Sequence, residues 1–396
     1  MIKGALEGLK IIDLTRVLAG PFSTMMLADM GAQVIKVEEP GKGDDSRFLG
    51  PFVNGESAYY MNLNRNKKGI TLNLKSPRGK ELFRRLVGMS DIVVENFRPG
   101  TMEKLGLGYE DLKKIHPRII YAAVSGFGQY GPYKDRPGYD IIGQAMGGLM
   151  STTGWPGQPP TRTGTAMGDV LGGLSLAVGM LSAIRYRDRR GVGQKIDVSL
   201  VDSVVASMEI ITQLYLVDGK VPERIGNRYE AVYPYDSFEA KDGYCVIGAG
   251  NNKLYCLLCK TIGRDELIDD GRFLTVRERV KNHAALKPLI EAWTKEREVA
   301  SIVDALLEAG VPAAPILDVK QVVDDPHIAG AREMFVDVDH PSAGRTRLTG
   351  CHIKMSETKP CVRTPAPTLG QHNEEIYGGL GLSADEVKKM RDEGVI

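Results

Sequence analysis

The stretch IIDLTRVLAGPFSTMMLADMGAQVIKV, residues 11–37, contains a strand signal, a helix signal and a second strand signal. Residues 11–14 form a short apolar run, and Pro21 opens a helix-like segment that ends at Gly31. The apolar run at 34–37 indicates the next strand. Two strands joined by a helix form a parallel pair, so this stretch predicts the start of an α/β sheet.

The same alternation continues through the first half of the chain. Further strand-like runs lie at 70–74, 91–97, 118–126 and 195–199, and helix patterns lie at 79–87, 101–115, 140–150, 169–187 and 201–217. Apolar strands separated by helices predict a mainly parallel sheet that is covered on both faces. The fold class is therefore α/β, with a large Rossmann-like, doubly wound domain.

The second half indicates a smaller domain inserted into the large one. We expect residues 1–217 to form the first part of the large domain, and the polar segment 218–235, punctuated by Pro and Gly, to be a linker. A hairpin pattern followed by helices predicts a small α+β domain at 236–327. Residues 328–396 then return to complete the large domain.

Composition excludes several classes of protein. Of the 396 residues, 42% are hydrophobic, and 51 basic against 50 acidic side chains leave a net charge of +1, which gives no general attraction to nucleic acid or membranes. The start MIKGALEGLKIIDLT has no apolar run behind a basic segment, so no signal peptide is expected. The longest uncharged apolar stretch, 170–184, is shorter than a spanning helix and predicts a buried core helix.

The cysteines and glycines exclude the common cofactors. Five cysteines are too few for a disulfide framework and favour reduced thiols in the cytoplasm. Cys256 and Cys259 form a C-x-x-C with no second pair or His cluster, so we expect core thiols and no metal. Gly248 and Gly250 follow a strand, but Lys253 stands where a dinucleotide fingerprint needs its third glycine, which argues against NAD or FAD.

Six co-linear stretches resemble family III CoA-transferases, the CaiB/BaiF-like group that includes formyl-CoA and carnitine CoA-transferases. They lie at 6–21, 31–47, 93–107, 125–140, 163–173 and 370–387 and span nearly the whole chain. The resemblance implies an interlocked homodimer that uses acyl-CoA and carboxylic acid substrates. It implies no permanently bound cofactor and no nucleic-acid or membrane partner.

Asp169 is the candidate nucleophile. It follows Gly168 at the start of an apolar helix, a position that is also typical of an N-cap. The resemblance of TAMGD (165–169) to the family motif implies that this aspartate attacks a thioester, forming a mixed anhydride and then an aspartyl-CoA thioester. A helix N-terminus suits such a carboxylate and a developing oxyanion.

The resemblance also implies which residues contact CoA. The turn at 96–98 matches the family's CoA-contacting turn, with Arg98 placed to pair with a phosphate; for each lysine, a solvated surface charge is the alternative. Gly248 and Gly250 resemble a glycine-rich loop that shields the intermediates, with a plain hairpin-to-helix turn as the alternative. The CoA-binding candidates are Val17, Ala19, Leu72, Lys75, Asn96, Phe97, Arg98 and Lys104.

Two alternative functions are disfavoured by single residues. Acyl-CoA racemases and isomerases of the same fold carry a histidine where this chain has Tyr139, so half of their acid–base pair is absent, and Tyr139 is expected to form a wall of the site. Asp140 is either a helix cap or an acid in the substrate site. A CoA-binding protein without turnover is disfavoured by the intact Gly168–Asp169 motif.

The acid substrate is less well defined. Leu18 stands where formyl-CoA:oxalate transferases carry glutamine, which disfavours oxalate. Arg16, Arg47 and Arg162 are candidates to bind a second carboxylate, with exposure on the surface as the alternative. We expect succinyl-CoA or another short acyl-CoA as donor and a dicarboxylic or hydroxy acid as acceptor.

Overall fold

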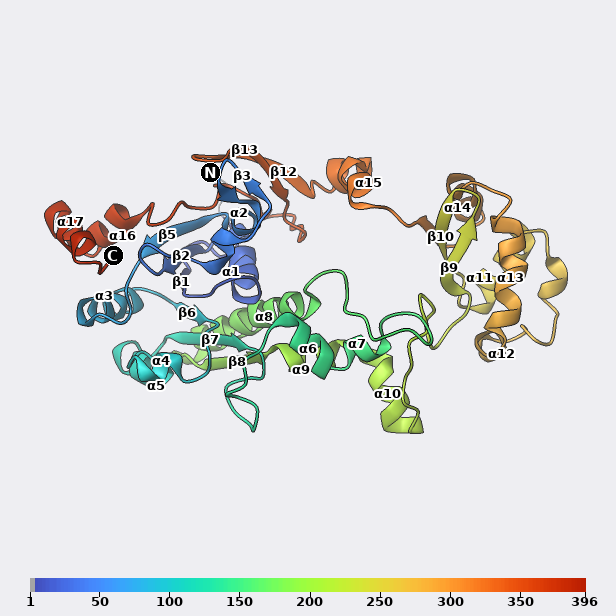
Figure 1. Cartoon of the computed structure of the whole chain (residues 1–396), viewed down its shortest axis with the longest axis horizontal. Coiled ribbons are helices and arrows are strands. Elements are labelled where there is room, and N and C mark those ends of the chain that lie inside the picture. The colour runs from blue at the N-terminus through green and yellow to red at the C-terminus, as the bar shows by residue number, and fades with distance from the viewer. Residues whose placement is uncertain (1–3) are drawn as a thin grey trace. The chain divides into compact units, whose positions relative to one another are not determined.

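The computed structural model describes residues 4–396, and the chain divides into two compact units. Figure 1 colours the chain from the N-terminus to the C-terminus. The first unit contains the chain up to Leu149, together with Arg162–Met208 and Asp325–Ile396. The second contains Met150–Thr161 and Glu209–Asp324.

The first unit is built on a six-stranded parallel sheet with the strand order β5-β2-β1-β6-β7-β8. The order reverses direction between β1 and β6, and the turns after these two strands therefore lead away from each other. This arrangement confirms the predicted α/β class with a parallel sheet. The strands are β1 Lys10–Asp13, β2 Gln33–Glu38, β5 Lys67–Thr71, β6 Ile92–Glu95, β7 Ile120–Ser125 and β8 Lys195–Ser199.

Helices cover both faces of this sheet (Figure 1). Successive strand residues point to opposite faces, so Ile11 packs with helices α1 and α8 while Ile12 packs with α3, α5 and α17. Burial on both sides explains why the strands are almost continuously apolar. These helices are α1 Ala19–Asp29, α3 Pro77–Val87, α5 Tyr109–Ile115, α8 Met167–Arg190 and α17 Ala384–Asp392.

Helix α8 is buried on one side only in the isolated chain, rather than being a fully buried core helix. Its close approach to α1 is set by Gly173, where a Cβ would lie 2.7 Å from the Ala19 carbonyl oxygen. By length and composition α8 could cross a membrane, as could the bent pair α9 Leu200–Ser207 and α10 Glu209–Asp218. Core helices pass the same test, and α8 packs on the sheet through its buried side.

The end of the chain returns to the first unit beside β5. The Tyr377 hydroxyl donates to the Thr71 carbonyl oxygen at 2.6 Å, and the Asn373 side chain bonds both the backbone and the side chain of Thr71. The other elements of this unit are η1 Asp45–Phe48, β3 Phe52–Val53, β4 Glu56–Ser57, α2 Ala58–Asn64, α4 Thr101–Lys104, α6 Asp140–Met146, η3 Pro326–Ala331, β12 Phe335–His340, β13 Gly344–Thr349 and α16 Asn373–Gly379.

The second unit has its own core around a three-stranded antiparallel sheet of order β11-β10-β9. Strands β9 Tyr235–Ala240 and β10 Gly243–Gly248 form the hairpin that the sequence predicts, and β11 is Ala313–Pro315. The remaining helices are α11 Asn252–Thr261, α12 Val276–Lys281, α13 His283–Thr294, α14 Val299–Glu308 and α15 Val319–Asp324, with η2 at Asp265–Leu267 and α7 Leu149–Thr152 at the unit boundary.

Candidate active site

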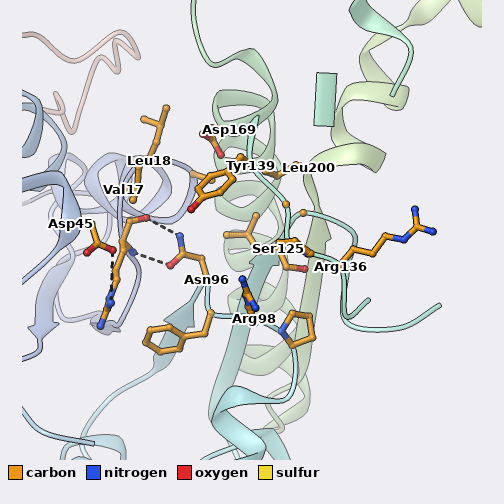
Figure 2. A pocket seen from close by; sticks show the side chains of 18 residues that line it. Val17, Leu18, Asp45, Asn96, Arg98, Ser125, Arg136, Tyr139, Asp169 and Leu200 are labelled. Atoms are coloured by element: carbon orange, nitrogen blue, oxygen red, sulfur yellow. Dashed lines mark hydrogen bonds and ion pairs between the residues drawn. The ribbon is translucent and has the colours of Figure 1, made fainter. Parts of the chain in front are cut away.

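A cavity of about 250 Å³ lies where the strand order reverses. The turns after β1 and β6 line one side of it, and the start of α8 lines the other. Figure 2 shows Asp169 beside Tyr139 and Leu200, with Leu18 near them and with Asn96 and Arg98 farther along the cavity. Ligands of open α/β sheets bind at such switch points, so the fold itself brings the candidate residues together.

Asp169 is the third residue of α8, and therefore not the N-cap that its local sequence allowed. The helix starts at Met167 behind Ala166, which supplies no side-chain cap. The cap comes instead from Asp140 on α6, whose Oδ1 accepts the backbone N–H groups of Gly168 at 2.7 Å and Asp169 at 3.3 Å. Asp140 is therefore a helix cap, and the helix that it caps is α8.

The carboxyl group of Asp169 has an unusual environment for an acid. Burial, and after it the negative charge of Asp140, raises the pKa of Asp169 to about 7. In the described part of the chain no cation forms an ion pair with it. A carboxylate that is poorly solvated and lacks a counter-charge is a stronger base and nucleophile than an ordinary surface aspartate.

Asp140 is itself held by a polar chain that the sequence did not reveal. Gln144 Nε2 donates to Asp140 Oδ2 at 2.7 Å, and Gln144 Oε1 accepts the backbone N–H of Thr163 at 3.0 Å. Gln144 is fully buried, so its amide is fixed between α6 and the segment that leads into α8. These contacts fix the end of α8 that carries Asp169.

Tyr59 on α2 is a second residue that sequence analysis missed. Burial, and after it the charges of Asp169, Asp44 and Asp140, raises the pKa of Tyr59 to about 12, so the phenol stays protonated at neutral pH. Its proximity to three carboxylates depends on long-range packing. The sequence signal for this residue is weak: two adjacent tyrosines, Tyr59 and Tyr60, follow the helix N-cap Ser57.

A second cavity of about 490 Å³ adjoins the first, because Arg16 and Phe97 line both. The Arg16 guanidinium lies over the Phe97 ring, 5.6 Å from its centroid. The second cavity also contains the predicted residues Leu72, Lys75 and Lys104. Leu72 is buried, whereas both lysine side chains are exposed. The first cavity contains the predicted residues Val17, Leu18, Ala19, Asn96, Phe97, Arg98, Tyr139 and Asp169.

Three predicted residues have positions that change their interpretation. Asn96 uses its side-chain amide to bond the backbone N–H and carbonyl oxygen of Arg16, both at 2.8 Å, and thus joins the two turns (Figure 2). Arg47 makes a bidentate pair with Glu38 and lines neither cavity, so it is not available for a substrate carboxylate. Arg162 is exposed and also lies outside both linings.

The cations that line the Asp169 cavity are Arg16, Arg98 and Arg136. Arg16 lies 3.8 Å from Glu39 and 3.9 Å from Asp45, whereas the Arg136 guanidinium stacks on the Tyr133 ring 3.6 Å from its centroid. Arg136 was not identified from the sequence. Among residues 4–396 no group of three or more His, Cys, Asp or Glu side chains is arranged to hold a metal ion.

Gly248 and Gly250 belong to the second unit. Gly248 ends β10, and a Cβ at Gly250 would lie 2.8 Å from the Val232 side chain. Asn251 then caps α11 by accepting the backbone N–H of Leu254 at 2.9 Å. Only glycine fits at 250 without displacing Val232, so local packing alone explains one of these two glycines.

An open parallel α/β sheet with a half-buried aspartate in a cavity at its switch point is an arrangement typical of proteins that bind a small ligand at that edge of the sheet. The family model of CoA-transferase family III matches residues 6–373. The chain is 42% identical to a succinyl-CoA:glutarate CoA-transferase of Mus musculus, over 99% of this chain and 90% of that one. It is 43% identical to an acetyl-CoA:oxalate CoA-transferase of Acetobacter aceti, over 94% and 95% of the two chains.

A solved structure agrees with these sequence relatives. The crystal structure of a CAIB/BAIF family protein from Brucella suis matches with a TM-score of 0.84 and 39% identity, over 96% of this chain and 100% of that chain. The protein therefore belongs to CoA-transferase family III, and it is an enzyme that transfers coenzyme A. The resemblance stated from the six sequence motifs is confirmed.

Proposed function

We propose that this enzyme moves coenzyme A from succinyl-CoA or another short acyl-CoA to a free dicarboxylic acid, through covalent intermediates on Asp169. The observation that carries the proposal is the position of Asp169. Its carboxyl group lines the cavity at the switch point, has a pKa raised to about 7 and has no cation paired with it in the described chain. The acceptors in the names of the two relatives above, glutarate and oxalate, are both dicarboxylates.

The covalent route needs only this carboxylate, the acyl-CoA donor and the acceptor acid. An Asp169 oxygen attacks the thioester carbonyl, and the C–S bond breaks. CoA thiolate departs, and the acyl group remains on Asp169 as a mixed anhydride. The thiolate then attacks the aspartyl carbonyl, which releases the donor acid and leaves an aspartyl-CoA thioester. The acceptor carboxylate attacks that thioester and expels CoA thiolate, which finally attacks the acceptor's acyl carbonyl and frees Asp169.

CoA has to extend across both cavities in this proposal. Its thioester lies at Asp169, and its adenosine and 3′-phosphate lie in the larger cavity beside Leu72, Lys75 and Lys104. The Arg16–Phe97 contact marks the junction between the two parts. Arg98 lines only the Asp169 cavity, so we assign it to the pyrophosphate or to an acid substrate rather than to the 3′-phosphate.

Water must be kept from the anhydride and the thioester. We assign this task to the loop that contains Gly248 and Gly250. This loop lies in the small domain, for which the sequence predicts the limits 236–327. In the interlocked homodimer that the family resemblance implies, this loop comes from the second chain. Apolar side chains exposed on the isolated chain support a second chain: Val178 on α8 is 64% exposed and Val217 on α10 is 75% exposed. The five free thiols favour the cytoplasm.

The test is the intact mass of the protein after mixing with succinyl-CoA, acetyl-CoA and formyl-CoA. The wild type should gain the mass of CoA, and Asp169→Asn should not. Asp45→Asn is the matched control, because Asp45 is a carboxylate at the other end of the same cavity and should leave the adduct intact. Transfer to glutarate and oxalate is then compared.

Two results would contradict this proposal. A wild type that gains no mass with any donor, but exchanges the α-proton of an acyl-CoA into deuterated water, would be an isomerase. A wild type that only binds CoA in calorimetry, with neither adduct nor exchange, would be a binding protein. Light scattering tests the dimer separately, since the proposal requires the mass of two chains in solution.

A further inference from the structure

The turn between β1 and α1 has a strained backbone where it lines the Asp169 cavity. Val17 has φ 65°, in the left-handed region that a β-branched residue rarely adopts. Leu18 and Ala19 follow directly and line the same cavity. Strained residues at functional sites persist only when the surrounding structure holds them. The contacts that hold Val17 therefore indicate which residues maintain the shape of this turn.

Those contacts come from a fully buried ion pair. Lys36 Nζ lies 2.6 Å from Asp44 Oδ2, and both side chains have 0% exposure. Asp44 Oδ1 accepts the backbone N–H of Val17 at 3.1 Å, and Lys36 Nζ donates to the carbonyl oxygen of Thr15. One partner of the pair thus bonds the backbone at the start of the turn, and the other bonds the strained residue itself.

Further hydrogen bonds hold Asp44 itself in place. Asp44 Oδ1 also accepts the backbone N–H of Ser46 at 2.9 Å and its hydroxyl at 2.8 Å. The backbone N–H of Asp44 donates to Glu38 at 2.9 Å, and Glu38 is bound bidentately by Arg47. The Asp44 carboxylate therefore has little freedom to follow a displaced turn, and the turn must conform to it.

We propose that Lys36 and Asp44 are positioning residues of the transfer reaction, which hold Val17 and Leu18 in the geometry that closes the cavity beside Asp169. This inference rests on the proposed function for its catalytic consequence. A buried ion pair is weak evidence for stability, because apolar residues of similar volume often stabilise a core equally well. Both partners also form hydrogen bonds with the backbone of one turn, and apolar residues could not form these bonds.

The test compares this pair with another buried pair of the same unit. Asp29 and Arg65 lie 2.8 Å apart with side-chain exposures of 5% and 1%, and neither lines the cavities described above. Asp44→Asn should lower turnover about 10- to 100-fold while changing the KM for acyl-CoA less than about threefold, because misplacement near the reacting atoms affects chemistry more than binding. Asp29→Asn, measured while folded, should keep turnover within about threefold of wild type.

Hydrogen–deuterium exchange of peptides that cover residues 15–19 gives a readout that does not depend on catalysis. Exchange should be faster in Asp44→Asn than in Asp29→Asn and wild type. If the wild type forms no covalent adduct, the proposed function fails, while exchange still decides whether the pair holds the turn. Unchanged exchange in Asp44→Asn, or an equal loss of turnover in Asp29→Asn, would overturn the inference.

A double variant covers the case in which Asp44→Asn does not fold. Lys36→Met/Asp44→Asn has no unpaired buried charge and should fold more readily than the single variant. It still lacks the donor to the Thr15 carbonyl oxygen, so its turnover should remain about 10-fold or more below wild type. Wild-type turnover in the double variant would show that the pair serves stability alone.

Discussion

Two carboxylates of the first unit, Asp169 and Asp44, have opposite electrostatic environments. Asp169 is half-buried and faces another carboxylate, and its pKa is raised to about 7. Burial also raises the pKa of Asp44, but the charge of Lys36 and hydrogen bonds from Lys36 and Ser46 outweigh burial and hold the pKa well below its usual range. Burial thus acts in the same direction on both carboxyl groups, and the presence or absence of a partner cation decides whether the pKa ends above or below its usual range.

Replacing Asp169 should give the largest effect on activity. Asp169→Asn should lower CoA transfer by about 1,000-fold or more, because the proposed route forms both covalent intermediates on this carboxylate. The folded-state pKa is above the unfolded value, so stability falls as pH rises through the window from 3.8 to about 7. The amide avoids this loss, and at pH 8 Asp169→Asn should melt at a higher temperature than wild type.

The thermal comparison is made by calorimetry at pH 5 and pH 8. The advantage of Asp169→Asn should grow between these two values. An Asp169→Asn variant that melts below wild type at pH 8 would mean that the carboxylate is stabilised by a contact that the isolated chain does not contain.

Asp44→Asn should have the opposite effect on stability. It removes the carboxylate that pairs directly with Lys36 in a fully buried site, which costs about 3–5 kcal/mol of unfolding free energy. The folded-state pKa of Asp44 is lowered, so its contribution is present above the unfolded pKa of 3.8 and is lost as pH falls further. Urea unfolding at pH 7 measures the difference, and a loss below about 1 kcal/mol would contradict the pairing.

The pH dependence of adduct formation should reveal the effect of Asp140. Only the ionised form of Asp169 attacks, so the rate should rise with pH around a midpoint of about 7. Asp140→Asn removes the neighbouring negative charge, and the midpoint should move to lower pH. Rapid-quench mass spectrometry across pH 5–9 gives both midpoints, and coincident midpoints would assign the raised pKa to burial alone.

The smallest effect should come from Asp45, the sequence neighbour of Asp44. Its side chain is 51% exposed, with Lys42 at 3.3 Å and Arg16 at 3.9 Å. Exposed pairs of this kind contribute little, so Asp45→Asn should change unfolding free energy by less than about 1 kcal/mol. Urea unfolding beside Asp44→Asn checks this, and a loss as large as that of Asp44→Asn would break the contrast between paired burial and exposure.

Local periodicity predicted most elements of the large unit and erred at their ends. The helix expected over 201–217 is interrupted at Met208, between α9 and α10, and α10 begins with Glu209 at φ 23°. The helix expected over 140–150 ends at Met146, because Gly147 and Gly148 follow and Gly148 has φ 90°. Apolar spacing is continuous across both breaks, so it contains no signal for them.

The sequence by itself determined the α/β class, the family and the candidate nucleophile, because strand and helix periods and short motifs are local. Only the tertiary structure decided that Asp140 caps the helix of Asp169, that Arg47 is bound by Glu38, and that Lys36 and Asp44 hold the turn at Val17. These roles depend on contacts between elements far apart in the chain. Burial and counter-charge, rather than residue type, then determine what each carboxylate does.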